Sequence, residues 1–156
     1  MQARKLQDKI ILATTTLLGV GYTPLCPGTA ASLVAVLVFI LIPNPVYFLS
    51  FTLISVVVSY LLSGKAEKIF KEKDCKKIVI DDFSGMLITF LFIPYNIKYI
   101  VCGFFLFRML DMLKVPPADR IEKFGGSKGI VGDDVVAGIY ANLILQVVRL
   151  LVNIFS

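Results

Sequence analysis

The sequence of 156 residues contains no histidine, and this absence limits the chemistry open to the protein. Without an imidazole, phosphohistidine intermediates, Ser-His-Asp triads and histidine-bound metal ions are excluded. Cysteine is scarce as well, because the three residues, Cys26, Cys75 and Cys102, are odd in number and have no C-x-x-C spacing. A disulfide framework and a zinc site are therefore not expected. Carboxylates, a thiol or a bound metal ion remain as catalytic groups.

The thiol is the weakest of these options. Cys102 and Arg108 have the C-x5-R spacing of cysteine phosphatases, which need a tight loop whose amides surround the phosphate. The intervening residues are apolar and predict a helix, which would separate Cys102 from Arg108 by about 9 Å along its axis. We expect Cys102 to be a buried, unreactive thiol.

Charge is also scarce. Charged residues make up 17% of the chain and hydrophobic residues 57%, with a mean hydropathy of +0.83. The charges occur in clusters separated by long apolar runs, as in membrane proteins with several spans. The net charge of +5 therefore indicates membrane orientation and attraction to anionic lipid, and no nucleic-acid partner is expected.

The apolar runs predict an all-α fold, a polytopic membrane helix bundle that forms one domain over residues 1–156. About four to five membrane segments are expected, at residues 28–42, 46–62, 83–93, 99–113 and 135–155. Segment 83–93 is marginal, because a helix of that length covers only about 16 Å. It is either a full crossing or a half-crossing whose turn, at residues 94–96, lies within the protein. Residues 4–18 predict an amphipathic helix in the membrane interface.

The distribution of charge predicts the orientation. With the N-terminus in the cytoplasm, every basic residue except Lys98 and Arg149 falls on the inner side, and so does every acidic residue. Lysine and arginine are enriched on the cytoplasmic side of membrane proteins. Acidic residues do not contribute to that rule, so their gathering on the inner face places any chemistry there.

Two aspartate pairs lie next to predicted spans. Asp81 and Asp82 precede one, and Asp133 and Asp134 precede another, while Asp111 lies near the inner end of a third. Aspartates at helix starts are commonly N-caps, which would explain one residue of each pair. Ionisable groups at the edge of hydrocarbon are costly, and adjacent carboxylates repel each other. We therefore favour a site for Mg²⁺, which prefers oxygen ligands, over capping alone.

Small residues follow both pairs. Ser84 and Gly85 come after the first pair, and Ala137 and Gly138 come after the second, which would allow the two helices to approach closely. A polar stripe then continues along the last span at helical spacing and is expected to face the bundle interior. Whether its later members serve function or only helix packing stays open. The stripe consists of Asp134, Gly138, Asn142, Gln146 and Arg149.

Arg108, Asp111 and Lys114 recur every three residues and share one helical face. They form either a structural ion pair or a phosphate clamp, in which Arg108 and Lys114 bind phosphate and Asp111 orients them or joins the metal. Two Gly-rich stretches lie on the same side. The first, taken alone, is more typical of an ordinary loop, but it also opens a helix whose amides, with Thr29 and Ser32, suit an anion. The second, residues 125–129, predicts a loop that folds over a headgroup.

Four motifs occur in the order found in the phosphatidylglycerophosphatase A family, which this chain resembles. They are G-x-G…P-x-x-P-G-T at residues 19–29, D-[DE]-x-x-G at 81–85, R-x-x-D-x-x-K at 108–114, and a Gly-rich loop ending in D-D-x-x-A-G at 126–138. The resemblance covers roughly residues 15–142. Ala31, Val115 and Ser127 depart from the family pattern, and none of them replaces a carboxylate.

The resemblance implies Mg²⁺-dependent hydrolysis of phosphatidylglycerophosphate to phosphatidylglycerol and phosphate, at the inner face of a bacterial cytoplasmic membrane. The phospholipid in the bilayer would be the partner of the protein. The catalytic residues would be Asp81, Asp82, Asp111, Asp133 and Asp134. Thr29, Ser32, Arg108 and Lys114 would bind substrate. The metal ligands would be Asp81, Asp82, Asp133 and Asp134.

Two other functions use membrane carboxylates. A CDP-alcohol phosphotransferase would need a D-G-x-x-A-R run, which the sequence lacks. A transporter or ion-binding protein would place its acids near the middle of the bilayer, whereas these acids all map to one edge. The small-residue faces leave a homo-oligomer open.

Overall fold

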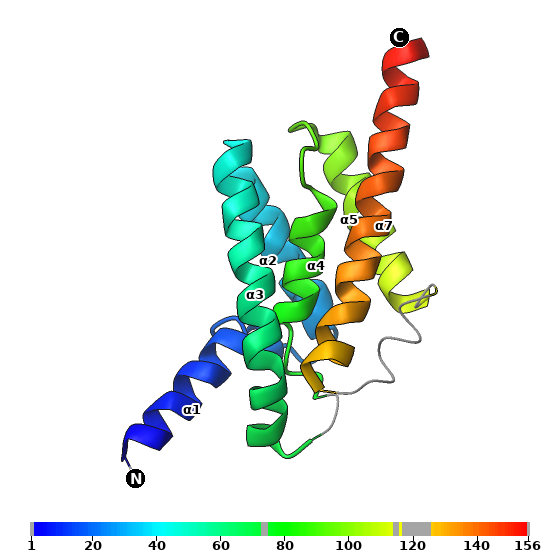
Figure 1. Cartoon of the computed structure of the whole chain (residues 1–156). Coiled ribbons are helices and arrows are strands. Elements are labelled where there is room, and N and C mark those ends of the chain that lie inside the picture. The colour runs from blue at the N-terminus through cyan, green and yellow to red at the C-terminus, as the bar shows by residue number, and fades with distance from the viewer. Residues whose placement is uncertain (1, 73–74, 114–115, 117–125, 156) are drawn as a thin grey trace.

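The computed structural model describes residues 2–72, 75–113, 116 and 126–155. Within these residues the fold is all-α, as predicted, and no strand is present (Figure 1). The elements are α1 (Gln2–Thr15), the short 3-10 helix η1 (Val20–Tyr22), α2 (Pro27–Leu41), α3 (Pro45–Phe70), α4 (Ile80–Thr89), α5 (Ile97–Leu113) and α7 (Gly126–Phe155).

Proline and asparagine define the starts of three helices. α2 and α3 begin with Pro27 and Pro45, where the missing amide hydrogen costs nothing because first-turn amides have no partner within the helix. Asn44 caps α3, since its Oδ1 accepts hydrogen bonds from the amides of residues 46 and 47 at 2.9 and 3.3 Å. Asn96 accepts a corresponding bond from the amide of Lys98 at the start of α5.

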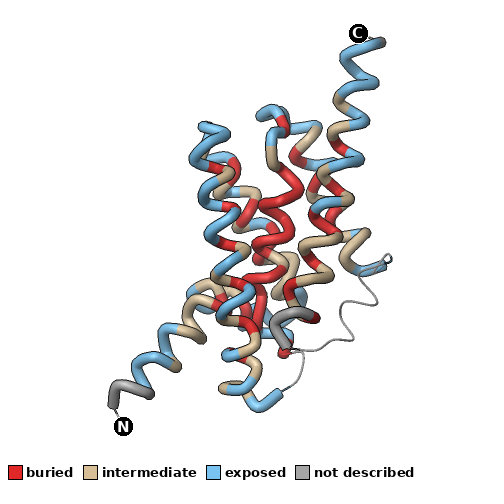
Figure 2. The backbone as a smooth tube through the Cα atoms, in the orientation of Figure 1, coloured by how far each residue is buried: buried red, intermediate tan, exposed pale blue. Residues whose placement is uncertain are grey.

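Helix α4 lies at the centre of the bundle, between α2, α3, α5 and α7, and α1 extends away from it (Figure 1). Every residue of α4 except Asp82 is buried, which makes it the most enclosed helix (Figure 2). Aromatic rings close the core beyond its end, where Phe39 stacks on Phe90 at 4.8 Å and meets Phe48 edge-on at 5.2 Å. The centre of the fold is therefore a short helix that touches little solvent or lipid.

The outer helices expose apolar side chains instead of polar ones. Leu53, Ile54 and Val57 on α3, and Leu143 and Val147 on α7, are all more than half exposed. Pro45–Phe70 and Gly129–Ile154 are long and apolar enough to cross a membrane, and Pro27–Leu41 is a shorter apolar helix. Long apolar helices with exposed apolar side chains are characteristic of membrane contact. Membrane association is supported, whereas four to five crossing segments are not confirmed.

The helix in the marginal segment 83–93 is shorter than the ~20 residues that a full crossing needs. This helix, α4, has ten residues and ends at Thr89, which gives a length of about 15 Å. The turn at residues 94–96 was expected within the protein in the half-crossing alternative, but Pro94, Tyr95 and Asn96 are exposed. Phe92 takes a left-handed conformation with φ of 59°, and this reverses the chain before the turn.

The polar stripe of α7 satisfies the carbonyl groups at the end of α4. The Asn142 amide donates to the carbonyl oxygens of Thr89 and Leu91 at 3.0 and 2.8 Å. Gln146 also donates to Leu91, and Arg149 donates to Phe92. The last carbonyls of a helix lack partners within it, and in an apolar environment they need donors from a neighbour. The packing alternative for Asn142 and Gln146 is therefore the one that these contacts support.

One predicted loop and one predicted helix end were wrong. Helix α7 begins at Gly126, nine residues before the expected span, so residues 126–129 are helical and do not form the predicted headgroup loop. Residue 125 lies outside the described residues. Helix α1 ends at Thr15 and not at residue 18, because Leu17, Leu18 and Gly19 have positive φ angles.

We predict that Asn142→Ala destabilises the protein, because it leaves the carbonyls of Thr89 and Leu91 short of donors. Interhelical hydrogen bonds of this kind contribute about 1–2 kcal/mol, so the apparent melting temperature in detergent should fall by a few degrees. Asn153→Ala is the matched control, since Asn153 lies on the same helix and is exposed. Equal melting temperatures for the two variants would show that the stripe does not hold the end of α4.

Candidate active site

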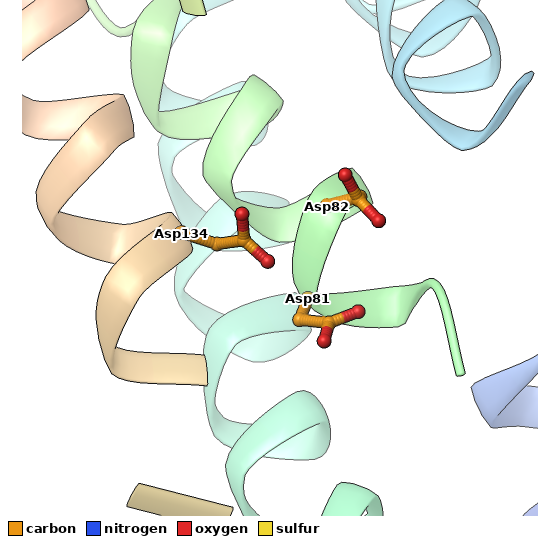
Figure 3. Close-up of side chains that lie close together, drawn as sticks. All are labelled: Asp81, Asp82 and Asp134. Carbon is orange, nitrogen blue, oxygen red and sulfur yellow. The ribbon is translucent and has the colours of Figure 1, made fainter. Parts of the chain in front are cut away.

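Three carboxylates meet at one end of the bundle. Asp81 and Asp82 lie in the first turn of α4, and Asp134 projects toward them from α7 (Figure 3). One oxygen from each lies within 4.8 Å of the other two. Asp81 and Asp134 are only 7% and 5% exposed, so two of the three carboxylates are almost removed from solvent.

A contact between glycines brings these helices together. A Cβ atom added to Gly138 would collide with the backbone carbonyl of Gly85, and one added to Gly85 would lie 2.6 Å from the carbonyl oxygen of Asp134. Any larger residue at either position would push α4 and α7 apart. The prediction that small residues after each pair allow close approach is confirmed.

The start of α2 forms another wall of the site. A Cβ atom on Gly28 would lie 2.6 Å from Oδ1 of Asp82, so the backbone of the P-G-T segment touches this carboxylate directly. The amides in the first turn of a helix attract negative charge. Of the residues predicted to bind substrate here, Ser32 is completely buried and its hydroxyl donates to the carbonyl of Gly28 at 3.0 Å, and Thr29 is half-buried.

Arg108 bridges two carboxylates. Its Nη1 atom pairs with Oδ1 of Asp82 and, at 2.9 Å, with Oδ2 of Asp111. The ion-pair alternative for Arg108 and Asp111 is thus present, and it extends to Asp82. Binding of phosphate by Arg108 stays a prediction, and Lys114 lies outside the described residues.

N-capping does not explain the aspartate pairs. Val79 occupies the cap position of α4, and no side chain makes a capping hydrogen bond there. Asp133 and Asp134 lie well inside α7, since that helix begins at Gly126. The first-turn position of Asp81 and Asp82 is favourable to negative charge, but it does not compensate for the burial of Asp81 and the partial burial of Asp82.

The electrostatics of the site favour an added positive charge. Burial raises the pKa of Asp81 well above its usual value, and the charge of Asp82 raises it further. Burial also raises the pKa of Asp82, to about 6, against the opposing effect of Arg108. Oδ1 of Asp81 is buried and has no hydrogen-bond partner. Three carboxylates with one unsatisfied buried oxygen fit a hard divalent cation such as Mg²⁺.

The fourth predicted metal ligand lies outside this group. Asp133 is half-buried, and its Oδ1 accepts a hydrogen bond from the amide of Asp134 at 3.1 Å. Its role as a ligand stays a prediction. Cys102 and Arg108 both lie in α5, as expected for a helix and not a phosphatase loop, but Cys102 is exposed and not buried.

Sequence reasoning missed Lys76 as a neighbour of the site. Lys76 lines a hollow of about 130 Å³ together with Asp81, and it also lines a second hollow of about 320 Å³ beside residues 21–25. The available signal was the lysine pair Lys76 and Lys77, which lies five and four residues before Asp81. By sequence alone, these lysines indicated only the orientation in the membrane.

Comparison with known proteins agrees with this arrangement. The family model described as "Phosphatidylglycerophosphatase A" matches residues 13–149. A "Putative phosphatidylinositol-3-phosphatase" of Bacteroides thetaiotaomicron is 33% identical over 141 residues, which cover 84% of this chain and 88% of that protein. No solved structure matches the chain.

Two further relatives carry the name of the family. The "Phosphatidylglycerophosphatase A" of Escherichia coli is 34% identical over 132 residues, covering 81% of this chain and 76% of that protein. The protein of the same name in Haemophilus influenzae is 31% identical over 136 residues, covering 84% and 83%. On these matches the chain, an enzyme of the phosphatase class, belongs to the phosphatidylglycerophosphatase A family.

Proposed function

We propose that the protein hydrolyses the phosphomonoester of phosphatidylglycerophosphate to phosphatidylglycerol and phosphate, with Mg²⁺ held by Asp81, Asp82 and Asp134. The observation that carries the proposal is the meeting of these three carboxylates, of which two are buried and one has an unpartnered oxygen. A structural subunit would not need so costly a group. The transport alternative is set aside because the family is one of phosphatases.

The substrate class follows from the names of the relatives. Two are named for phosphatidylglycerophosphate, and the Bacteroides protein for a phosphatidylinositol phosphate. Both kinds of lipid carry a phosphomonoester on a polyol, and a phosphodiester joins that polyol to the diacylglycerol. The family description favours phosphatidylglycerophosphate for this chain.

The chemistry divides between the ion site and the arginine. A bound Mg²⁺ supplies charge neutralisation and polarises the phosphoryl oxygens. Arg108, held between Asp82 and Asp111, offers its planar donors to the same phosphate. Water attacks phosphorus, and the bond from phosphorus to the glycerol oxygen breaks. With no histidine in the chain, a carboxylate takes the proton of the water and returns it to the departing glycerol oxygen, which leaves as a hydroxyl group; Asp111 and Asp133 are the candidates outside the three-carboxylate group.

The location follows from charge and hydropathy. We propose a multi-pass protein of the bacterial cytoplasmic membrane whose active site faces the cytoplasm. The long apolar helices α3 and α7 support membrane insertion, and the basic residues on the side of the carboxylates support the orientation. Helix α1, which leaves the bundle with Lys5 and Lys9 exposed, would lie in the interface.

The first test is phosphate release from phosphatidylglycerophosphate by detergent-purified protein. We expect release to require Mg²⁺, to stop with excess EDTA and to return when Mg²⁺ is restored. Release from phosphatidic acid should be slower. Release that continues in EDTA would exclude the metal but keep the phosphatase. No release from folded protein would exclude the substrate.

A second test separates metal binding from turnover. Asp134→Asn should lower kcat by at least about 100-fold, because it removes one of three ligands. It should also reduce the rise in melting temperature that Mg²⁺ produces in the wild type. Asp8→Asn is the control, since Asp8 lies on α1, which extends away from the bundle. Normal turnover and a normal Mg²⁺ response in Asp134→Asn would contradict the site assignment.

A further inference from the structure

Two hollows flank the carboxylate centre and share one residue. Lys76 lines both the small hollow that contains Asp81 and a larger one, which we call the loop hollow. The loop hollow is lined by residues 21–25, Pro27, Lys76 and Lys77. Its volume of about 320 Å³ is some ten times the ~30 Å³ share of one water molecule, so a phosphate group fits inside.

The two hollows differ in charge. Among the described residues, the loop hollow is lined by two lysines and by no acidic side chain, whereas the small hollow is lined by the buried Asp81. Lysine ammonium groups bind phosphate as point charges. The loop hollow is therefore suited to an anion, next to a centre suited to a cation.

The walls of the loop hollow are fixed to one another. A Cβ atom on Gly21 would collide with the carbonyl of Lys77, so the loop backbone lies directly on the lysine segment. The ammonium of Lys77 lies 5.7 Å from the ring centre of Tyr22 and 5.5 Å from that of Phe70. The amide of Val79 donates to the carbonyl of Thr15 at 3.0 Å. An anion site here would need little reorganisation on binding.

The loop hollow also adjoins the side of the centre formed by α2. Pro27 lines it, and the next residue, Gly28, touches the carboxylate of Asp82. Leu18 and Leu25, on the loop around it, are both 90% exposed. Exposed leucines on a loop with neighbouring lysines are typical of a segment at the membrane interface. A lipid could thus reach from the bilayer past this loop to the carboxylates.

We propose that Lys76 and Lys77 bind the phosphodiester of the lipid substrate in the loop hollow, while its phosphomonoester lies at Asp81, Asp82 and Asp134. This assignment rests on the proposed function, and it gives a reason why the enzyme would prefer phosphatidylglycerophosphate to phosphatidic acid. Phosphatidic acid has a single phosphate attached directly to diacylglycerol. It cannot occupy both sites, so the lysines distinguish the two lipids.

The test compares Lys76→Ala/Lys77→Ala with wild type on phosphatidylglycerophosphate and phosphatidic acid, with the same acyl chains in neutral detergent micelles. We expect KM for phosphatidylglycerophosphate to rise about tenfold, the effect of losing charge-assisted contacts, with little change in kcat. KM for phosphatidic acid should not change. Lys65→Ala/Lys68→Ala is the matched control, because these exposed lysines of α3 line neither hollow and carry the same total charge.

Two further variants keep the test decisive if loss of the Lys77 ring contacts prevents folding. Lys76→Ala alone should raise KM for phosphatidylglycerophosphate in the same direction. Lys76→Arg/Lys77→Arg should restore most of the affinity, because the charge remains. Activity of the wild type on phosphatidylglycerophosphate confirms the proposed function independently of these variants.

Three results would overturn the proposal. Equal increases in KM for both lipids would show a general attraction to anionic lipid, and the same increase in the control would show an effect of net charge. Weaker inhibition by inorganic phosphate, with unchanged KM for both lipids, would assign the lysines to the released product. Unchanged KM and unchanged inhibition would leave the lysines without a role in binding.

Discussion

A close backbone contact between Gly85 and Gly138 holds α4 and α7 side by side, and the site depends on it. Four residues before each glycine stands an aspartate, Asp81 in α4 and Asp134 in α7. Four residues after them stand Thr89 and Asn142, which are joined by a 3.0 Å hydrogen bond across 53 residues of sequence. Along both helices, the first of three successive turns brings the carboxylates together and the second brings the glycines together. The third provides the hydrogen bond to the carbonyl of Thr89 at the end of α4. The two helices run parallel, and each residue of α4 lies beside the residue 53 positions later in α7. The contacts that pack the helices therefore also determine where the carboxylates meet.

This pairing of positions in α4 and α7 explains why Asp133 does not join the other three carboxylates. In α4 the aspartate pair stands three and four residues before Gly85, whereas in α7 the additional Ala137 places the pair four and five residues before Gly138. One residue turns a helical position by about 100°. Asp134 therefore occupies the helical position that matches Asp81. Asp133 occupies the position that matches Ile80, and so it lies outside the three-carboxylate group.

The parts of the structure that depend on local pattern could be predicted from the sequence. The all-α fold, the gathering of acids at one end and the close approach at the small residues all follow from residue type and spacing. The start of α7 could not be predicted, because Gly126 and Gly129 have low helix propensity and the helix forms there nonetheless. The contact of Gly28 with Asp82 and the hollows beside Lys76 depend on which helices become neighbours, which one sequence does not specify.

The contacts that stabilise the bundle lie away from the carboxylates, so the fold tolerates the repulsion between them. Like charges at Asp81, Asp82 and Asp134 oppose the approach of α4 and α7, and Arg108 pairs directly with only one of them. Contacts farther along α4 outweigh this repulsion. Phe39, Phe48 and Phe90 pack there, and the polar stripe of α7 donates hydrogen bonds to the carbonyls at the end of α4. Because that end does not depend on the ion site, the three carboxylates can stay together without a bound ion until a cation and a phosphate arrive. A divalent cation bound by the three carboxylates then removes the repulsion that folding leaves in place.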